Sequence, residues 1–376
     1  MEFDWSPELM ELRERVRSVI AAHLPGDWAS SNRNVATTEL VHFTKEFCKA
    51  LAANDLWVPH WPTEFGGRNA SLWEQAVIGE ELWGVGEPRG PQYMNTNWIA
   101  PAIMEFGTQQ QKDRYLPPIA AGDVIWCQGF SEPDAGSDLA SLRTQAIRDS
   151  DVYIVNGQKI WTSYAHVAEH CFLLVRTNPA VPKRQGISVL LVDMDLLGIE
   201  VREVPSILAD HAVHEVFFSD VVVPADCLLG DENHGWHVTT TALAHERIGV
   251  ARYERVSRVV DEAVSEQEPA LTDEAAIGTT LAMSEAARLL TYVAIQDQIS
   301  GREATGSVSI QKVAKALTER AALTSLAREA GQEHLVYESH SDAQLVAALP
   351  STITGGTLEV QYDLIARRSL GLPRSN

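Results

Sequence analysis

The chain has 376 residues, more than one hydrophobic core ordinarily organises, and a typical domain size of about 150 residues predicts two or three domains. Its 51 acidic residues outnumber its 30 basic ones, and the formal net charge of −21 disfavours binding to nucleic acid or to anionic membranes. The amino-terminal residues lack a basic stretch followed by an apolar one, and no apolar run approaches the ~18 residues of a membrane span. Because the four cysteines are scattered and typical of reduced thiols, we expect a cytoplasmic protein.

The first zone of the chain has helical periodicity. Ser6 and Pro7 give a capping hydroxyl and a first-turn proline, and apolar residues then repeat at helical spacing. Further helices are expected at residues 39–53, 72–83 and 97–106. Pro117 and Pro118 are interpreted as a boundary near the end of this zone.

The middle zone, from about Gly122, has the period of two that is typical of strands. The pair Asn156 and Gly157 separates two alternating runs, which predicts a two-residue hairpin turn. Further strands are expected at residues 171–175, 187–192, 199–204 and 216–223. These runs predict a small β-barrel or sandwich inserted between two helical zones.

After Gly235 the helical period returns, and apolar residues from Trp236 to Val260 predict one long, partly buried helix. Thr272 is expected to cap the next helix. Helices at 275–299, 309–333 and 357–370 complete a bundle. The predicted fold class is therefore α+β multidomain. Its parts are an N-terminal helical domain at 1–121, a middle β domain at 122–230 and a C-terminal helical bundle at 231–376.

Cysteines and histidines show no pattern typical of a metal site. The four cysteines have no paired spacing and are expected to be reduced, mostly buried thiols. They are Cys48, Cys127, Cys171 and Cys227. His211 and His214 stand beside Asp210 and Glu215 without further ligands nearby, so we predict no metal.

Two segments of the middle zone combine tight turns, hydroxyl side chains and large rings. Residues 127–138 read CQGFSEPDAGSD, and residues 156–163 read NGQKIWTS. Backbone N–H groups and hydroxyls beside rings suit a flat heterocycle that forms hydrogen bonds along its edge. Taken singly, each segment also fits a simple turn in a hairpin-rich domain. In this order, between two helical zones, they resemble the flavin-binding middle domain of the acyl-CoA dehydrogenases, and the resemblance covers nearly the whole chain.

The resemblance implies FAD as the cofactor and an acyl-CoA thioester as the substrate. The positions that match the flavin contacts of the family are Gln128, Phe130, Ser131, Gly136, Trp161, Ser163, Thr357 and Glu359. Ser137 matches the serine that contacts the CoA arm. An electron-transfer flavoprotein is implied as the oxidant.

Removal of the α-proton of a thioester needs a carboxylate in a dry pocket. The family places this base in one of two positions. In the late loop, where other members have Tyr-Glu-Gly-Thr, this chain has Gly355 in place of the acid. The other position is a glutamate before an arginine in the helix after the β domain, and Glu246 and Arg247 match it.

Glu246 also falls on the apolar face of the expected helix, three residues after Leu243 and four before Val250. Burial of a carboxylate there would destabilise the fold, so its presence indicates a functional role. A glutamate that pairs with an arginine at a helix or subunit interface is the alternative.

The glycine loop has its own implied role, because in the family a backbone N–H at this position polarises the thioester carbonyl. Gly355 and Gly356 retain that donor, vacate space near the α-carbon and, with Arg247, are assigned to the substrate site. A flexible turn is the alternative interpretation of the two glycines.

Two segments that homotetrameric members donate to a neighbouring subunit are not recognisable. The Arg-x-x-Phe-Gly segment, which meets the flavin pyrophosphate, should fall near residues 264–276, where acids replace the cation. The Phe-Gly-Gly-x-Gly segment should fall near 330–336, where only Gly331 matches. This combination resembles the α2β2 heterotetrameric enzymes that act on steroid side-chain CoA thioesters, in which a related subunit would complete the site. A divergent homotetramer is the alternative.

Three functions are therefore compared. The leading one is α,β-dehydrogenation of an acyl-CoA with Glu246 as the base. An acyl-CoA oxidase would use the same residues and pass electrons to oxygen. A non-catalytic scaffold subunit is the third, because Gly355 removes one of the two possible bases.

Overall fold

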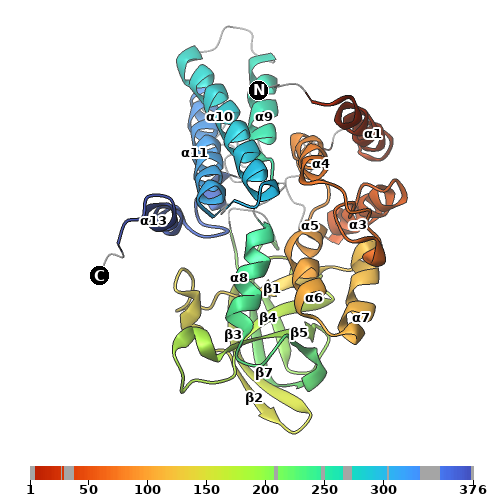
Figure 1. The fold of residues 1–376 in the computed structure, drawn as a ribbon, viewed down its shortest axis with the longest axis vertical. Coiled ribbons are helices and arrows are strands. Elements are labelled where there is room, and N and C mark those ends of the chain that lie inside the picture. The colour runs from red at the N-terminus through yellow and green to blue at the C-terminus, as the bar shows by residue number, and fades with distance from the viewer. Residues whose placement is uncertain are drawn as a thin grey trace. The chain divides into compact units, whose positions relative to one another are not determined.

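The computed structural model describes residues 5–26, 28, 38–206, 211–246, 250–265, 273–302, 305–330 and 348–373. Contacts divide the chain into two compact units that interleave along the sequence (Figure 1). The first unit comprises Met1–Arg33, Ala70–Pro88 and Arg247–Asn376, and the second comprises Asn34–Asn69 and Arg89–Glu246. Within the described ranges, no helix is both long and apolar enough to cross a bilayer.

The second unit contains one eight-stranded sheet with the order β6-β7-β3-β2-β4-β5-β8, and β1 pairs with β4 in parallel. The strands are β1 (Trp126–Gly129), β2 (Gln145–Asp149), β3 (Val152–Thr162), β4 (His170–Arg176), β5 (Ile187–Asp193), β6 (Ile199–Glu203), β7 (His214–Pro224) and β8 (Leu228–Leu229). Alternating side chains of β3, β4, β5 and β7 form its buried core. The predicted middle β zone is confirmed, and all four cysteines are buried.

The predicted hairpin at Asn156 and Gly157 is wrong, because β3 continues through both residues, with a shift in its pairing with β7 between Val155 and Gly157. The turn between β2 and β3 lies instead at Ser150, whose φ is +55°. The Asn156 side chain is used across the sheet: its oxygen accepts from the backbone N–H of Asp220 at 2.9 Å. A Cβ at Gly157 would lie 2.6 Å from Thr144 Cα, so this glycine permits a close approach inside the sheet.

Helices of the second unit are α3 (Thr38–Ala53), α5 (Gln92–Met94), the π-helical turn η3 (Asn95–Ile99), α6 (Ala100–Phe106), α7 (Gln109–Ala120) and α8 (Gly235–Glu246). The boundary expected at Pro117 and Pro118 is wrong, since α7 contains both prolines. Thr108 and Gln111 form a capping box at its start, and Gln111 also donates to the carbonyls of Asp226 and Leu228. Each proline lacks an N–H and removes one helical hydrogen bond, but the proline carbonyls still accept, from the N–H of Ala121 at 2.9 Å and of Asp123 at 3.0 Å.

The first unit contains α1 (Pro7–His23), α4 (Leu72–Gly84), α9 (Arg252–Ser265), α10 (Glu274–Ile299), α11 (Thr305–Ala330) and α13 (Leu358–Arg368). Ser6 caps α1 as predicted. Asp273, not Thr272, caps α10, and its carboxylate accepts from the N–H of Ala276 at 3.0 Å. Thr272 lies outside the described residues.

The single long helix predicted from Trp236 to Val260 is wrong. Helix α8 ends at Glu246, α9 begins at Arg252, and Val250 is not helical. The carbonyl of Val250 accepts instead from Lys315 of α11 at 2.8 Å. A tertiary hydrogen bond therefore replaces the helical one at this point.

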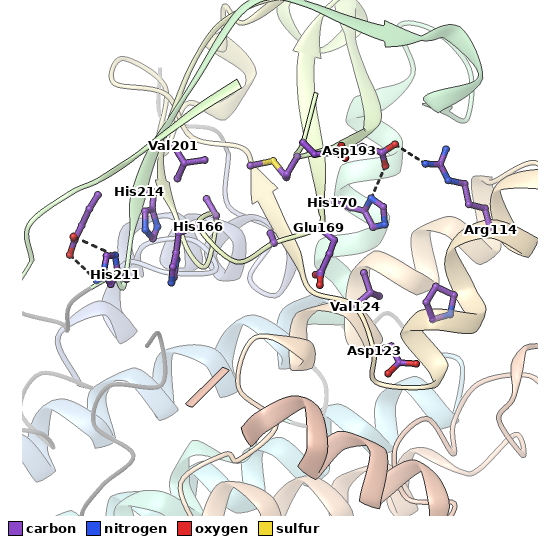
Figure 2. A pocket seen from close by; sticks show the side chains of 16 residues that line it. Arg114, Asp123, Val124, His166, Glu169, His170, Asp193, Val201, His211 and His214 are labelled. Atoms are coloured by element: carbon purple, nitrogen blue, oxygen red, sulfur yellow. Dashed lines mark hydrogen bonds and ion pairs between the residues drawn. The ribbon is translucent and has the colours of Figure 1, made fainter. Parts of the chain in front are cut away.

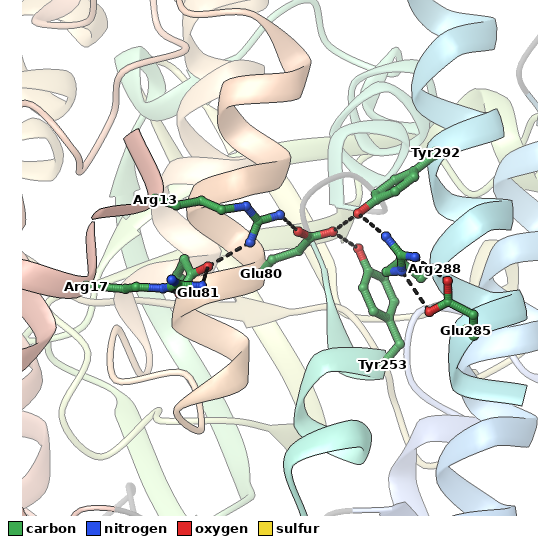
Figure 3. A network of polar contacts seen from close by, with 8 residues as sticks. All are labelled: Arg13, Arg17, Glu80, Glu81, Tyr253, Glu285, Arg288 and Tyr292. Carbon is green, nitrogen blue, oxygen red and sulfur yellow. Dashed lines mark hydrogen bonds and ion pairs between the residues drawn. The ribbon is translucent and has the colours of Figure 1, made fainter. Parts of the chain in front are cut away.

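Glu80 of α4 lies at the centre of a buried polar network in the first unit (Figure 3). Its carboxylate accepts from the hydroxyls of Tyr253 at 2.9 Å and Tyr292 at 2.5 Å and pairs with Arg13. Burial, and then the negative charge of the neighbouring Glu80, raise the pKa of Glu254 to about 7. The network therefore joins α1, α4, α9 and α10 through side chains that are largely buried.

Candidate active site

The two segments predicted to bind the flavin are joined directly in the second unit. The N–H of Ile160 donates to the carbonyl of Ser131 at 2.9 Å. Lys159 Nζ donates to the carbonyl of Phe130 at 3.1 Å. The end of β3 is therefore fixed against the loop that follows β1, although the two segments are well separated in sequence.

A buried ion pair supports this junction. The side chain of Lys159 is fully buried, and its Nζ lies 2.8 Å from Glu132 Oε1. Glu132 also accepts from the backbone N–H groups of Arg143 at 2.6 Å and Thr144 at 2.8 Å. Burial lowers the pKa of Lys159 to about 8, against the charge of Glu132. Burial would raise the pKa of Glu132, but Lys159 and these hydrogen bonds hold it below its usual value.

Trp161 has a left-handed backbone conformation, which is unusual for a residue in a β-strand. Its φ is +61°, a region that non-glycine residues enter rarely and at a cost of about 1–3 kcal/mol. The strand register shifts between Lys159 and Thr162, and Trp161 is 59% exposed. Ser163 follows and is half-buried. The strained backbone thus presents a large aromatic side chain outward beside a hydroxyl.

Two buried polar atoms beside this junction have no partner among the described residues. They are Gln128 Nε2 and Thr162 Oγ1. Buried donors and acceptors are almost always paired, so an unpaired set indicates a missing ligand or water. A flavin carries donors and acceptors along its pyrimidine edge, so these residues fit that group. Gln128 was predicted from the sequence, whereas Thr162 was missed although it lies between two predicted residues.

Gly136 and Ser137 lie on an exposed turn of the same loop. A Cβ at Gly136 would meet no atom within 4 Å, so the fold itself does not require a glycine there. The structure therefore leaves their predicted contacts with flavin and with CoA as predictions.

Glu246 is the last residue of α8, and its side chain lies outside the described part of the structure. Arg247 lies outside the described residues altogether. The predicted roles of this pair therefore rest on the sequence. Much of the two donor segments at 264–276 and 330–336 is likewise not described.

The glycine loop lies in the first unit, immediately before α13. Gly355 has a φ of +67° and Gly356 a φ of +93°. The buried side chain of Gln361 donates to the carbonyl of Gly355 at 3.2 Å, a support that the sequence did not reveal. A Cβ at Gly356 would lie 2.7 Å from Gln361 Nε2. The loop is thus held in a left-handed conformation that suits glycine.

Thr357 and Glu359, both predicted to meet the flavin, occupy the start of α13. The Thr357 hydroxyl accepts from the N–H of Val360 at 3.3 Å, so it caps the helix. Glu359 is exposed in the first turn, where the helix dipole favours an acid. Both residues thus have a structural role, and their contact with flavin stays a prediction.

A cavity of about 910 Å³ lies within the second unit, next to the end of β3, where His214 Nδ1 lies 3.3 Å from the carbonyl oxygen of Thr162 (Figure 2). Its wall includes the rings of His166, His211 and His214, with centroids 4.6 Å apart for the first and third and 4.8 Å for the first and second. Burial, and then the charge of His166, lower the pKa of His214. The rings lie face to face, and the described residues contain no group of three His, Cys, Asp or Glu arranged to hold a metal ion.

The opposite wall of this cavity carries a chain of charged contacts (Figure 2). His170 Nδ1 lies 2.8 Å from Asp193, which also pairs with Arg114 at 2.7 Å. The described charges on this wall are therefore paired with one another.

A β domain between two helical zones, with a cradle of unpaired polar atoms beside an outward indole, is the architecture of a flavoprotein oxidoreductase. Three domain models of one family match the chain in order. They are "Acyl-CoA dehydrogenase, N-terminal domain" at residues 6–123, "Acyl-CoA dehydrogenase, middle domain" at 127–221 and "Acyl-CoA dehydrogenase, C-terminal domain" at 233–370.

Full-length relatives agree. The chain is 34% identical to the acyl-CoA dehydrogenase FadE26 of Mycobacterium tuberculosis over an alignment of 405 positions, which covers all of both chains. It is 33% identical to IpdE1 of the same organism, with 98% of each chain covered. It is 36% identical to FadE34 of that organism over 86% of this chain, and it spans 46% of the length of FadE34. The chain belongs to the acyl-CoA dehydrogenase family and is an enzyme of that family.

Solved structures give the same result. A structure titled "Tcur3481-Tcur3483 steroid ACAD" is 30% identical with a TM-score of 0.89, and all of both chains is covered. The ChsE4-ChsE5 complex from Mycobacterium tuberculosis is 32% identical with a TM-score of 0.84, again over the whole of both chains.

Proposed function

We propose that this enzyme catalyses the FAD-dependent α,β-dehydrogenation of an acyl-CoA thioester to the 2-enoyl-CoA. The observation that carries the proposal is the junction of the two flavin segments at Ser131 and Ile160, with unpaired polar atoms on Gln128 and Thr162 beside it. The chemistry that FAD supplies when bound is acceptance of the β-hydride at its N5.

The residues of the cradle have separate roles in this proposal. Gln128, Phe130 and Ser131 offer polar groups to the pyrimidine edge, and Gly136 lies in the same loop. Trp161 and Ser163 cover the ring and reach toward N5. The positive φ of Trp161 supports this, because strained backbone clusters at functional sites. Thr357 and Glu359 meet the other end of the cofactor, and Ser137 contacts the CoA arm.

Glu246 is the proposed base that removes the α-proton, with Arg247 beside it in the substrate site. The geometry of the glycine loop supports this choice. At φ values of +67° and +93°, Gly355 and Gly356 occupy a conformation that a glutamate adopts only with strain. The loop keeps a backbone N–H as the donor that stabilises the developing enolate, and the proton goes to a carboxylate elsewhere.

The substrate is proposed to be bulky, with a steroid side-chain thioester as the leading candidate. Two of the similar structures support this, one titled a steroid ACAD and the other a complex of two different chains. We propose an α2β2 assembly in which a related subunit supplies the residues missing near 264–276 and 330–336. An electron-transfer flavoprotein is the proposed oxidant.

Bleaching of the flavin by substrate, compared between wild type and Glu246→Gln, tests the proposal. The purified chain, alone and with a related subunit, is mixed anaerobically with a panel of linear and steroid side-chain CoA thioesters while flavin absorbance is followed. Wild type is expected to bleach, and Glu246→Gln is expected to keep FAD without bleaching. Equal bleaching by Glu246→Gln would show that another residue is the base.

The oxidase alternative is separated by the fate of the electrons. Aerobic turnover that yields one peroxide per product would favour the oxidase, whereas turnover that needs a dye or flavoprotein acceptor favours the dehydrogenase. Absence of bleaching by wild type with every thioester and partner would favour the scaffold reading.

A further inference from the structure

Gln361 of α13 is buried against the glycine loop of the first unit. It is 0% exposed, and its Nε2 donates to the carbonyl of Gly355 at 3.2 Å. A carbonyl oxygen only accepts, so this bond fixes which end of the amide faces the loop. The other end, Oε1, is buried and has no partner among the described residues. Within that part of the chain, the loop carbonyl is therefore the one hydrogen-bond partner of this side chain.

The bond holds the peptide unit between Gly355 and Gly356. A trans peptide directs its C=O and N–H to opposite sides, so a Gly355 carbonyl turned toward Gln361 turns the N–H of Gly356 away from it. Because neither glycine carries a Cβ, this peptide can rotate at little steric cost. Among the residues that the structure describes, the N–H groups of both glycines find no hydrogen-bond acceptor. The peptide is therefore held from its carbonyl side.

The chain before this peptide is anchored by other groups. The N–H of Thr354 donates to the carbonyl of Pro350 at 2.9 Å, and the Thr354 hydroxyl donates to the same carbonyl at 3.0 Å. Lys312 of α11 donates to the carbonyl of Ser351 at 2.9 Å. The loop is thus fixed up to Thr354, and Gln361 acts on the glycines that follow.

Packing alone does not explain a glutamine at this position. A buried acceptor without a partner costs about 1–3 kcal/mol, whereas a typical hydrogen bond contributes only about 0.5–1.5 kcal/mol. Methionine has a similar length, adapts to irregular space and carries no such acceptor. What Gln361 adds to the fold is therefore the orientation of the loop peptide rather than stability.

We propose that Gln361 is a positioning residue that fixes the peptide between Gly355 and Gly356, so that the N–H donors of the loop keep the orientation that polarises the thioester carbonyl. This inference rests on the proposed function. An N–H polarises a carbonyl only when it lies within hydrogen-bond distance and points at the oxygen. Complete loss of such a donor costs about 100- to 1000-fold in rate, and a donor that is misdirected part of the time costs less.

The test uses the full chain in its active assembly and the variant Gln361→Met. The expected result is a fall of roughly 10- to 100-fold in the single-turnover rate of flavin reduction, with bound FAD as in wild type. The Tm is expected to stay close to that of wild type, because the variant loses one hydrogen bond and also one unsatisfied acceptor.

A second measurement does not depend on turnover. Isotope-edited infrared spectra of a bound 2-enoyl-CoA, the proposed product, report the C=O stretch of the thioester, which hydrogen bonding lowers. In Gln361→Met this frequency is expected to return toward that of the free thioester. A loss of packing elsewhere in the protein would not produce that shift.

Gln111→Met is the matched control. Gln111 is a buried glutamine of the second unit that also donates to backbone carbonyls, those of Asp226 at 2.7 Å and Leu228 at 2.9 Å, and it accepts from the N–H of Thr108 at 3.0 Å. Because both ends of its amide have partners, the variant is expected to lower Tm while leaving the rate and the C=O frequency unchanged. If Gln361→Met keeps the wild-type rate and C=O frequency, the positioning role is overturned.

Gln361→Glu keeps the shape of the side chain and serves alone if Gln361→Met does not fold. A protonated carboxyl can donate to the carbonyl of Gly355, whereas an ionised one repels it. Burial raises the pKa of a carboxyl, so the ratio of variant to wild-type rate is expected to fall as pH rises through that pKa. A ratio within twofold of one at every pH would contradict the role. Failure of the proposed function is distinct, because it would appear as an inactive wild type or a fully active Glu246→Gln.

Discussion

Lys159 and Glu132, 27 residues apart in sequence, form a buried ion pair 2.8 Å long that joins the two segments proposed to bind the flavin. The pair does not touch the unpaired atoms of Gln128 or Thr162 itself. It fixes the carbonyl of Phe130 and the end of β3, and so determines where those atoms lie.

The first prediction concerns that pair. Lys159→Met leaves the Glu132 carboxylate buried without its cation, and breaking a buried pair in this way costs about 3–5 kcal/mol. We expect the free energy of unfolding, measured with urea, to fall by that amount, together with loss of bound FAD. Lys183→Met is the control, since Lys183 pairs with Asp138 at the surface at 3.0 Å and its loss should cost at most about 1 kcal/mol. Equal effects of the two variants would contradict the prediction.

The second prediction separates fold from cofactor binding. Thr162 Oγ1 is buried without a partner among the described residues, so Thr162→Val removes an unsatisfied group from the apoprotein. We expect the unfolding free energy of the apoprotein to stay level or to rise by up to about 1 kcal/mol. FAD affinity, measured by titration of the apoprotein, is expected to fall about 5- to 10-fold, the equivalent of one hydrogen bond. A variant that binds FAD as tightly as wild type would place Thr162 outside the cradle.

The third prediction uses the pKa of Glu254, which burial and Glu80 raise to about 7. Because this pKa exceeds that of the unfolded chain, the folded state binds more protons between about pH 4.5 and 7, and stability falls as pH rises through that window. Glu254→Gln removes the charge. It is expected to stabilise the protein by roughly 2 kcal/mol at pH 8 and to change little at pH 5. Urea denaturation at both pH values provides the measurement, and a pH-independent difference would argue against the shift.

The fourth prediction concerns the polar network in Figure 3. Tyr253→Phe and Tyr292→Phe each remove one donor from the buried Glu80 carboxylate and are expected to lower the unfolding free energy by about 1–3 kcal/mol. Because both hydroxyls serve one carboxylate, the double variant should differ from the sum of the single losses by 0.5 kcal/mol or more, as a rough guide. Strict additivity would show that the two hydroxyls act independently.

The fifth prediction compares the two loop glycines. Gly356→Ala places a Cβ 2.7 Å from Gln361 Nε2 at a φ of +93°, whereas Gly355→Ala places an alanine at a φ of +67°, nearer the centre of the left-handed region. We expect losses of about 2 kcal/mol or more for Gly356→Ala and about 1 kcal/mol for Gly355→Ala. Thermal unfolding of both variants gives the comparison, and a reversed order would mean that Gln361 moves aside without cost.

The order of helical, β and helical zones could be read from the sequence, because hydrophobic period and capping residues are local signals. Ser6 and the strand at residues 187–192 are examples. Features set by tertiary contacts could not be read in this way. Asn156 is a residue type typical of turns, but in the fold its side chain binds the backbone of Asp220. The break at Val250 is accompanied by a hydrogen bond to Lys315, 65 residues later in the sequence.

The residues of the candidate site likewise fall into two groups, those that the sequence indicated and those that only the fold reveals. Residue types and spacing indicated Gln128, Trp161 and the glycine loop. The supports behind them, Lys159 with Glu132 and Gln361, read as an ordinary strand lysine, a loop acid and a helix glutamine in the sequence. Their role depends on burial, which is a property of the folded chain.

The interleaving of the two units has a consequence for biosynthesis. Every strand of the sheet and its covering helices belong to one unbroken stretch apart from an early helix, so the β unit can close while the ribosome is still translating the final third. Helix α4, in contrast, emerges early, and its Trp83 packs in a cluster with Tyr253 of α9 and Ala287 of α10, which are made much later. Nascent chains stalled before α9 should therefore be the species that recruit chaperones.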